Sequence, residues 1–202
     1  EALAGLSLLG QHAMLRRAII SQAGLFAVSS VLTLAMPFIV IDELGYSESL
    51  VGLLFAVALA GGILAFVLQR RWNPAQMIAQ PLLSYAYGAV AAGFFVLLIS
   101  IELPALMLVA LLSGMAAATV YLFAVTPIQN QTPPGFHGRL FAVLEAASSF
   151  VAPISYLAAG ALLYTLGGQQ RWWLFLGMGG VALIWAGALR RKPQIRRDAG
   201  RS

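Results

Sequence analysis

The chain contains no cysteine, and charged residues are scarce in it. The missing thiols exclude disulfides, thiolate metal sites and a cysteine nucleophile. Asp, Glu, Lys and Arg make up only 9% of the 202 residues, against about 25% in an average soluble domain. So few charges cannot cover the surface of a water-soluble protein. Disordered chains are polar, so the hydrophobic share of 60% excludes disorder as well. The composition therefore predicts an integral membrane protein.

Long stretches without any charge divide the chain into segments that can cross a bilayer. A helix needs about 20 apolar residues to span a hydrocarbon core of about 30 Å. Strands of a membrane barrel would instead alternate polar and apolar residues over about ten positions. The uncharged stretches are continuous, so we predict an all-α integral membrane fold with six transmembrane helices. Their predicted bounds are Ala18–Ile41, Ser49–Leu68, Met77–Ser100, Ala105–Val125, Leu140–Leu166 and Trp172–Leu189.

The six predicted helices form one transmembrane domain, residues 18–189. Residues 1–17 contain an apolar run that is too short to cross a membrane, so we expect a cytoplasmic interfacial segment there. Residues 190–202 are expected to form a basic cytoplasmic tail. The predicted joins are short, and the longest is Thr126–Arg139. No join is long enough for a folded extramembrane domain, so any function must lie among the helices or at their ends.

Basic residues gather on one side of this predicted topology. With six spans, both termini lie on the same side as the second and fourth loops. That side carries all but one of the 12 basic residues, namely Arg16, Arg17, Arg70, Arg71, Arg139, Arg190, Arg191, Lys192, Arg196, Arg197 and Arg201. The other side carries Arg171, Asp42, Glu43, Glu48 and Glu102. Because cytoplasmic loops are enriched in Lys and Arg, we expect an inner-membrane protein with both termini in the cytoplasm.

A short sequence repeat indicates that the helices form two related sets of three. Gly52-Leu-Leu-Phe-Ala-Val57 opens the second predicted helix, and Gly138-Arg-Leu-Phe-Ala-Val143 opens the fifth. Five of the six positions match at an offset of 86 residues. The two sets start on opposite sides of the membrane, so we predict a 3+3 inverted repeat. The other explanation of the match is chance similarity in a chain dominated by a few residue types.

Polar side chains inside the predicted helices are candidate site residues, because such a group is costly in a bilayer unless it faces protein or water. Helical spacing places them on single faces of three helices. The predicted substrate cavity is lined by Gln22, Ser29 and Thr33 of the first helix, Ser113 and Tyr121 of the fourth, and Ser149 and Tyr156 of the fifth. For each serine the alternative is helix packing, since Ser and Thr often bond their own helix backbone.

Glu145 is the only acidic residue within a predicted span. It follows Arg139 by six residues, which places it about 9 Å deeper along the helix axis. One hypothesis is a protonatable group that couples proton entry to substrate exit. The other is a gate or tether that pairs with a basic residue, and the shallow depth favours this second role because water stays within reach. Glu145 and Arg139 are therefore the candidate coupling or gate residues.

Several kinds of chemistry are not expected from this sequence. The chain has two histidines, His12 and His137, and no third metal ligand accompanies them, so we expect no metal site and place His137 in a solvated loop. With one acid and no histidine inside the spans, we do not expect an enzyme. No glycine-rich phosphate loop is present, so we expect no ATP and no cofactor.

Three stretches resemble one family of transporters. They are Gly45-Tyr-Ser-Glu-Ser-Leu-Val-Gly52, Gln129-Asn-Gln-Thr-Pro-Pro-Gly-Phe-His-Gly-Arg-Leu-Phe141, and Pro153 followed by Gly160-Ala-Leu-Leu163. From about residue 14 to 192 the chain resembles the C-terminal six-helix half of a major facilitator superfamily transporter. Within that superfamily it is most similar to the macrolide- and siderophore-exporter-like branch of bacterial permeases. The resemblance implies that the first and fourth helices line a central cavity while the third and sixth face lipid.

This resemblance also implies a function and a partner. We expect secondary active efflux of a small amphipathic organic compound by alternating access, as in an antiporter driven by an ion gradient. In the superfamily two six-helix halves enclose the substrate, so we expect either an N-terminal half of the same chain or a second copy. The start at Glu1 favours the fragment. The alternative is a six-helix membrane protein with a binding or assembly role and no transport of its own. No nucleic-acid partner is expected.

Site-specific labelling checks the predicted topology. Because the chain lacks cysteine, single cysteines placed near its two ends are unique targets for a membrane-impermeant thiol reagent. An even number of spans predicts that both react from the same face of sealed vesicles. Labelling from opposite faces would contradict the six-helix topology.

Overall fold

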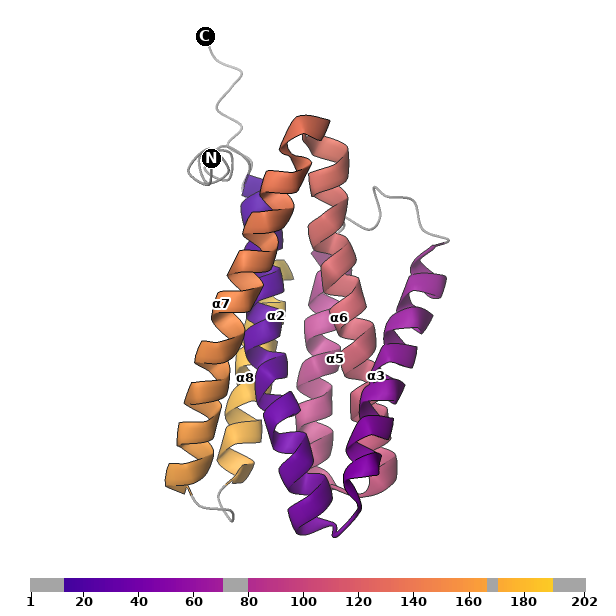
Figure 1. Cartoon of the computed structure of the whole chain (residues 1–202), viewed down its shortest axis with the longest axis vertical. Helices are drawn as coiled ribbons and strands as arrows, with labels where there is room; N and C mark the ends of the chain where they lie inside the picture. Colours follow the sequence, from indigo (N-terminus) through magenta and orange to yellow (C-terminus); the bar gives the residue numbers. More distant parts are fainter. Residues whose placement is uncertain (1–12, 71–79, 167–170, 191–202) are drawn as a thin grey trace.

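The computed structural model describes residues 13–70, 80–166 and 171–190. Within these ranges it contains no strand, and its long helices run side by side in one bundle (Figure 1). The elements are α2 (Ala13–Pro37), the π-helix η1 (Phe38–Glu43) that continues it, α3 (Glu48–Gln69), α5 (Gln80–Ile99), α6 (Leu103–Gln131), α7 (Pro134–Leu166) and α8 (Arg171–Arg190). The predicted all-α membrane fold is confirmed.

The helices have the lengths that a bilayer requires. Five described segments are long and apolar enough to cross a membrane by length and composition, namely Leu15–Glu43, Glu48–Gln69, Leu82–Ile99, Leu103–Asn130 and Gly135–Ala161. Within α8 the described residues contain a shorter apolar stretch, Phe175–Leu189. The bundle therefore presents five to six membrane-spanning helices.

The join between α6 and α7 differs from the prediction. The sequence predicts a long connection over Thr126–Arg139, but α6 extends to Gln131 and α7 begins at Pro134. Polarity marks where a helix leaves the hydrocarbon, whereas backbone hydrogen bonds can continue into the headgroup region. Pro134 suits the first turn of α7, where its missing N–H is not needed. The predicted ends at Val125 and Leu140 are therefore wrong.

The first helix starts earlier than predicted. α2 begins at Ala13, so residues 13–17 are helical and continuous with the first span. The rest of the expected interfacial segment lies outside the described residues, as do His12, the predicted helix start at Met77 and the expected tail after Arg190.

Consecutive helices run in opposite directions, so their ends gather at the two ends of the bundle (Figure 1). One end holds the start of α2, the end of α3 and the short turn between α6 and α7. Arg16 and Arg17 lie in the first turn of α2, Arg70 directly follows α3, and Arg139 lies near the start of α7. The acidic residues at the opposite end are Asp42, Glu43, Glu48 and Glu102. Apart from Arg171, which starts α8 at the acidic end, the charged residues near the described helix ends are thus separated by sign along the long axis of the bundle.

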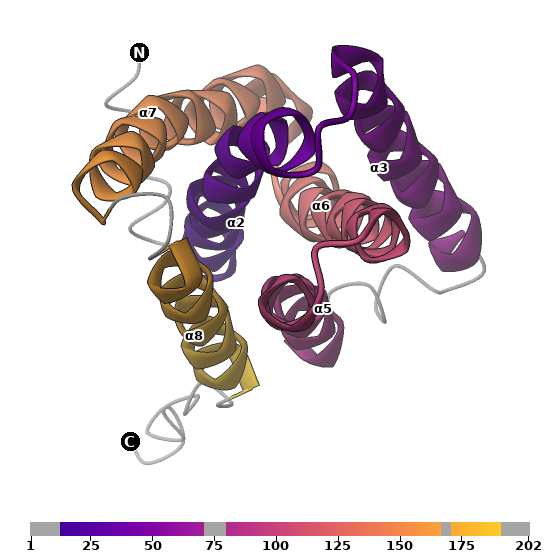
Figure 2. The ribbon, with the colours of Figure 1, turned by 90° about the horizontal axis from the view of Figure 1, so that it is seen from below.

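Helix packing follows the predicted repeat. α3 packs along α6, α7 packs along α2, α2 packs on α6, and α5 packs on α8 (Figure 2). In the predicted repeat α2, α3 and α5 correspond to α6, α7 and α8. The α3–α6 contact then corresponds to the α7–α2 contact, whereas the α2–α6 and α5–α8 contacts each join two corresponding helices. α2 and α6 also start at opposite ends of the bundle. The symmetry is approximate, because α5 packs along α6 whereas α8 hardly touches α2. This arrangement is the one that a 3+3 inverted repeat requires.

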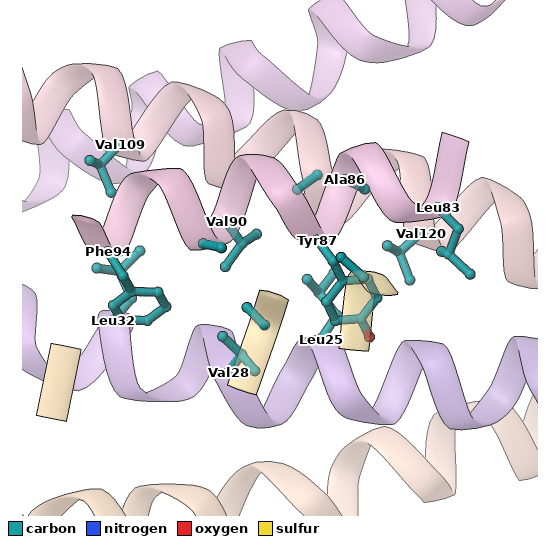
Figure 3. Close-up of a cluster of buried hydrophobic side chains, with 14 of the residues drawn as sticks. Leu25, Val28, Leu32, Leu83, Ala86, Tyr87, Val90, Phe94, Val109 and Val120 are labelled. Carbon is teal, nitrogen blue, oxygen red and sulfur yellow. The ribbon is translucent and has the colours of Figure 1, made fainter. Parts of the chain in front are cut away.

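The core lies between α2, α5, α6 and α8. Its labelled side chains in Figure 3 include Leu25, Val28 and Leu32 of α2 and Tyr87, Val90 and Phe94 of α5. From α8, the ring of Trp185 lies 6.3 Å from that of Tyr87, and the ring of Phe175 lies 6.0 Å from that of Phe94. The Tyr87 hydroxyl donates a hydrogen bond to the carbonyl oxygen of Ser21. Apolar packing and one buried hydrogen bond thus hold α5 to its neighbours.

Two glycines bring the backbones of α3 and α6 together. A Cβ atom on Gly61 of α3 would overlap the carbonyl oxygen of Leu111. In the reciprocal contact, a Cβ atom on Gly114 of α6 would overlap the carbonyl oxygen of Ala58. Small residues allow this close approach in membranes, where helix association depends on packing and not on the hydrophobic effect. The glycine of the repeat at Gly52 has no such neighbour within 4 Å.

Replacing Gly114 with alanine tests this contact. We expect Gly114→Ala to lower the free energy of unfolding by about 1–3 kcal/mol, because the added methyl group forces the two backbones apart. Thermal unfolding of the purified protein in detergent measures the effect, and Gly52→Ala is the matched control with open space around the new methyl group. Equal stability of the two variants would show that the close approach is not needed.

Candidate functional site

A small cavity lies between α2, α3 and α6. Its volume is about 70 Å³. It is lined by Leu32, Thr33 and Met36 of α2, by Val51, Leu54, Phe55 and Ala58 of α3, and by Ala110 and Ser113 of α6. Apart from two hydroxyl groups, every lining side chain is apolar. The structure thus brings together one predicted site residue from the first helix and one from the fourth, Thr33 and Ser113.

The two hydroxyl groups in this cavity differ in their hydrogen bonding. Thr33 Oγ1 donates to the carbonyl oxygen of Ser29 at 3.0 Å, one turn earlier in its own helix. Ser113 Oγ is buried and has no hydrogen-bond partner among the described residues. Most buried polar atoms in proteins are paired, so Ser113 Oγ is the group here with an unused donor and acceptor. Ser29, another predicted cavity residue, does not line this cavity, and its backbone carbonyl accepts the hydrogen bond from Thr33.

Gln22 lies deeper in the bundle and away from this cavity. Its side chain is buried, and its Oε1 atom has no hydrogen-bond partner among the described residues. It precedes Thr33 by three turns of α2, about 16 Å along the axis. Helical periodicity predicts a common face for the two residues, but of the two only Thr33 lines the cavity.

Three of the predicted cavity residues are on the outside of the six-helix bundle. Tyr121 of α6 and Ser149 and Tyr156 of α7 have exposed side chains, and none of them lines the cavity. Within this chain they therefore do not meet Thr33 and Ser113.

Comparison with known protein families gives one match. The sequence model of the Major Facilitator Superfamily matches residues 18–201, which include most of α2 and all of the other described helices. The chain belongs to the Major Facilitator Superfamily. Members of this superfamily are membrane transporters and not enzymes. No curated protein and no solved structure matches the chain.

In this major facilitator protein, the exposed face of α7 carries a polar stripe. Glu145, Ser149 and Tyr156 follow one another at helical spacing, and all three side chains are exposed. An acidic side chain in contact with lipid hydrocarbon is costly. By contrast, the large side chains described as exposed in α8 are hydrophobic, namely Trp173, Leu176, Val181, Leu183 and Ile184. The α7 face is therefore suited to water or protein, and the α8 face to lipid.

Arg139, one of the candidate coupling or gate residues, lies near the turn between α6 and α7. The guanidinium group of Arg139 lies over the ring of Phe136, 5.7 Å from its centre. His137 lies in the first turn of α7, and its Nε2 atom is 3.0 Å from the carbonyl oxygen of Thr132. The placement of His137 in a solvated loop is therefore wrong: it ties the start of α7 to the end of α6.

One buried polar pair was not identified from the sequence. Gln69 Nε2, at the end of α3, donates to Thr119 Oγ1 of α6 at 2.6 Å. Gln69 Oε1 is buried and has no partner among the described residues. The only signal was an isolated threonine within the apolar run of α6. Elsewhere in the described parts of the chain, no three His, Asp or Glu side chains lie close enough to hold a metal ion.

Substitution of Glu145 separates the two hypotheses for this residue. If it couples proton entry to substrate exit, Glu145→Gln abolishes proton-driven transport while expression stays normal, because the amide cannot be protonated. Transport in proteoliposomes under an imposed pH gradient measures this. Glu102→Gln is the control, an exposed acid at the opposite end of the bundle. Unchanged transport in Glu145→Gln would exclude the coupling role.

Proposed function

We propose that this chain is one six-helix half of a secondary active transporter that exports a small amphipathic organic compound by alternating access. The observation that carries the proposal is the cavity between α2, α3 and α6, in which Ser113 offers an unpaired hydroxyl group within apolar walls. Ligand sites are typically apolar with a few polar groups that fix orientation. Such a lining favours a compound with a large apolar part and a hydrogen-bonding group.

The small volume of the cavity supports the proposal that a second unit supplies part of its wall. A volume of about 70 Å³ is well below the roughly 300–1,000 Å³ of sites for organic ligands. The polar stripe of Glu145, Ser149 and Tyr156 on α7 also needs water or protein beside it. We infer that a second six-helix unit faces both the cavity between α2, α3 and α6 and the polar stripe of α7, and that it completes the site. It is either an N-terminal half of the same protein or a second copy of this chain.

Charge distribution supports an orientation. Arg16, Arg17, Arg70 and Arg139 lie at one end of the bundle, and basic residues favour the cytoplasmic side of a membrane. We propose that the protein lies in the inner membrane. The basic end and both termini are then on the cytoplasmic side.

An ion gradient is the proposed energy source, and protons are the first candidate. Glu145 is the acidic group that could respond to a proton gradient from within the membrane span. The outward direction and the macrolide- and siderophore-exporter-like branch rest on the resemblance carried by the three stretches Gly45–Gly52, Gln129–Phe141 and Pro153–Leu163.

Substitutions of Ser113 test the binding site. A screen of amphipathic compounds by thermal shift first identifies a ligand of the unmodified protein. We expect Ser113→Ala to weaken its binding about 2- to 10-fold, because one hydrogen bond is lost, and Ser113→Phe to abolish binding by filling the cavity. Ser148→Ala is the matched control, because this buried serine bonds the carbonyl oxygen of Leu144 in its own helix.

The same experiment distinguishes transport from a binding or assembly role. A ligand that binds through Ser113 and is moved across proteoliposomes supports the transporter. A ligand that binds with the same dependence on Ser113 and is never moved, even with a second six-helix unit present, would support the alternative.

A further inference from the structure

A second hollow opens on the outside of the bundle, at the basic end of the α3–α6 pair. It has a volume of about 380 Å³ and is lined by Phe66, Val67 and Arg70 at the end of α3 and by Leu122 of α6. None of these residues lines the cavity that holds Thr33. This groove, defined by its four lining residues, is therefore distinct from the candidate substrate site.

The length of α3 sets the depth of the groove in the membrane. Its 22 residues, Glu48–Gln69, span about 33 Å, close to the thickness of the hydrocarbon core. Glu48 and Arg70 therefore lie at opposite headgroup regions. Phe66 and Val67 lie within one turn of Arg70 on the hydrocarbon side. The groove thus has one cationic end at the headgroups and apolar walls just below them.

Arg70 is the charged group of this groove, and its side chain is exposed. Its guanidinium group makes no hydrogen bond or ion pair with any residue in the described parts of the chain. The other three lining side chains are apolar. A guanidinium group offers a planar fork of N–H donors that matches the oxygens of a phosphate.

The walls of the groove are fixed by neighbouring contacts. The hydrogen bond from Gln69 to Thr119 ties the end of α3 to α6. Thr119 lies one turn before Leu122 on α6, so the bond is made beside the groove. Closer to the middle of the membrane, Gly61 and Gly114 hold the two backbones together. A groove between two helices that are joined in this way keeps its shape without a ligand.

We propose that the groove binds an anionic phospholipid, with the phosphate on Arg70 and the upper part of one acyl chain against Phe66, Val67 and Leu122. A cation at headgroup level together with apolar walls at acyl depth is complementary to such a lipid. A free phosphate would use only the arginine and would leave the apolar walls exposed.

Native mass spectrometry of the full chain tests the proposal with dioleoyl-phosphatidylglycerol and dioleoyl-phosphatidylcholine as probes. We expect tighter binding of phosphatidylglycerol, and about a five-fold loss of that binding in Arg70→Gln, the contribution of one basic residue near an anionic headgroup. Arg16→Gln is the matched control, because it removes the same charge from an exposed site at the same end of the bundle. Equal losses in the two variants would overturn a specific site at Arg70.

A second pair of variants tests the apolar wall while keeping the arginine. Val67→Trp fills the groove and is expected to weaken phosphatidylglycerol binding, whereas Leu68→Trp places the same ring beside it, on a side chain that is also exposed but does not line the groove. Glycerol 3-phosphate serves as the headgroup without acyl chains and is expected not to displace the lipid. Three results would overturn the proposal: no preference for phosphatidylglycerol, undiminished binding in Val67→Trp, or displacement of the lipid by glycerol 3-phosphate.

Discussion

Lipid hydrocarbon offers no hydrogen bonds, and this constraint accounts for most of the structure. Backbone groups must be paired within each span, so the spans are helices, and charged residues gather at the helix ends. Hydroxyl groups within the spans obey the same rule by bonding a carbonyl oxygen one turn earlier, as Ser30, Thr119, Thr126 and Ser148 do. Ser113 Oγ is an exception among the described residues, which is why it identifies the candidate site.

The same constraint explains how much of the fold could be predicted from the sequence. The uncharged stretches predicted the number and the direction of the helices, because the length of each helix must match the thickness of the bilayer. They could not give the helix ends at Gln131 and Pro134, because helical hydrogen bonds do not stop where the hydrocarbon does. The inverted repeat at Gly52 and Gly138 was visible as a short match, and helix packing supports it.

The candidate site was predictable only in part. Spacing along one helix put Gln22 and Thr33 on a common face, but it could not say which helix packs against that face at each depth. Polarity predicts that Ser149 and Tyr156 avoid lipid, yet both side chains are exposed on this six-helix unit. The pairing of Gln69 with Thr119 joins positions 50 residues apart. Such a contact depends on how two helices dock, which no local pattern encodes.

The glycine contact between α3 and α6 has a mechanical consequence. No side chain separates the two backbones at Gly61 and Gly114. The two helices therefore have little freedom to slide or tilt separately, and they move as one pair. α2, which supplies the opposite wall of the cavity, hardly touches α3. Because α2 does pack on α6, the cavity widens or narrows most easily when the α3–α6 pair rotates about its contact with α2, which moves α3 toward or away from α2.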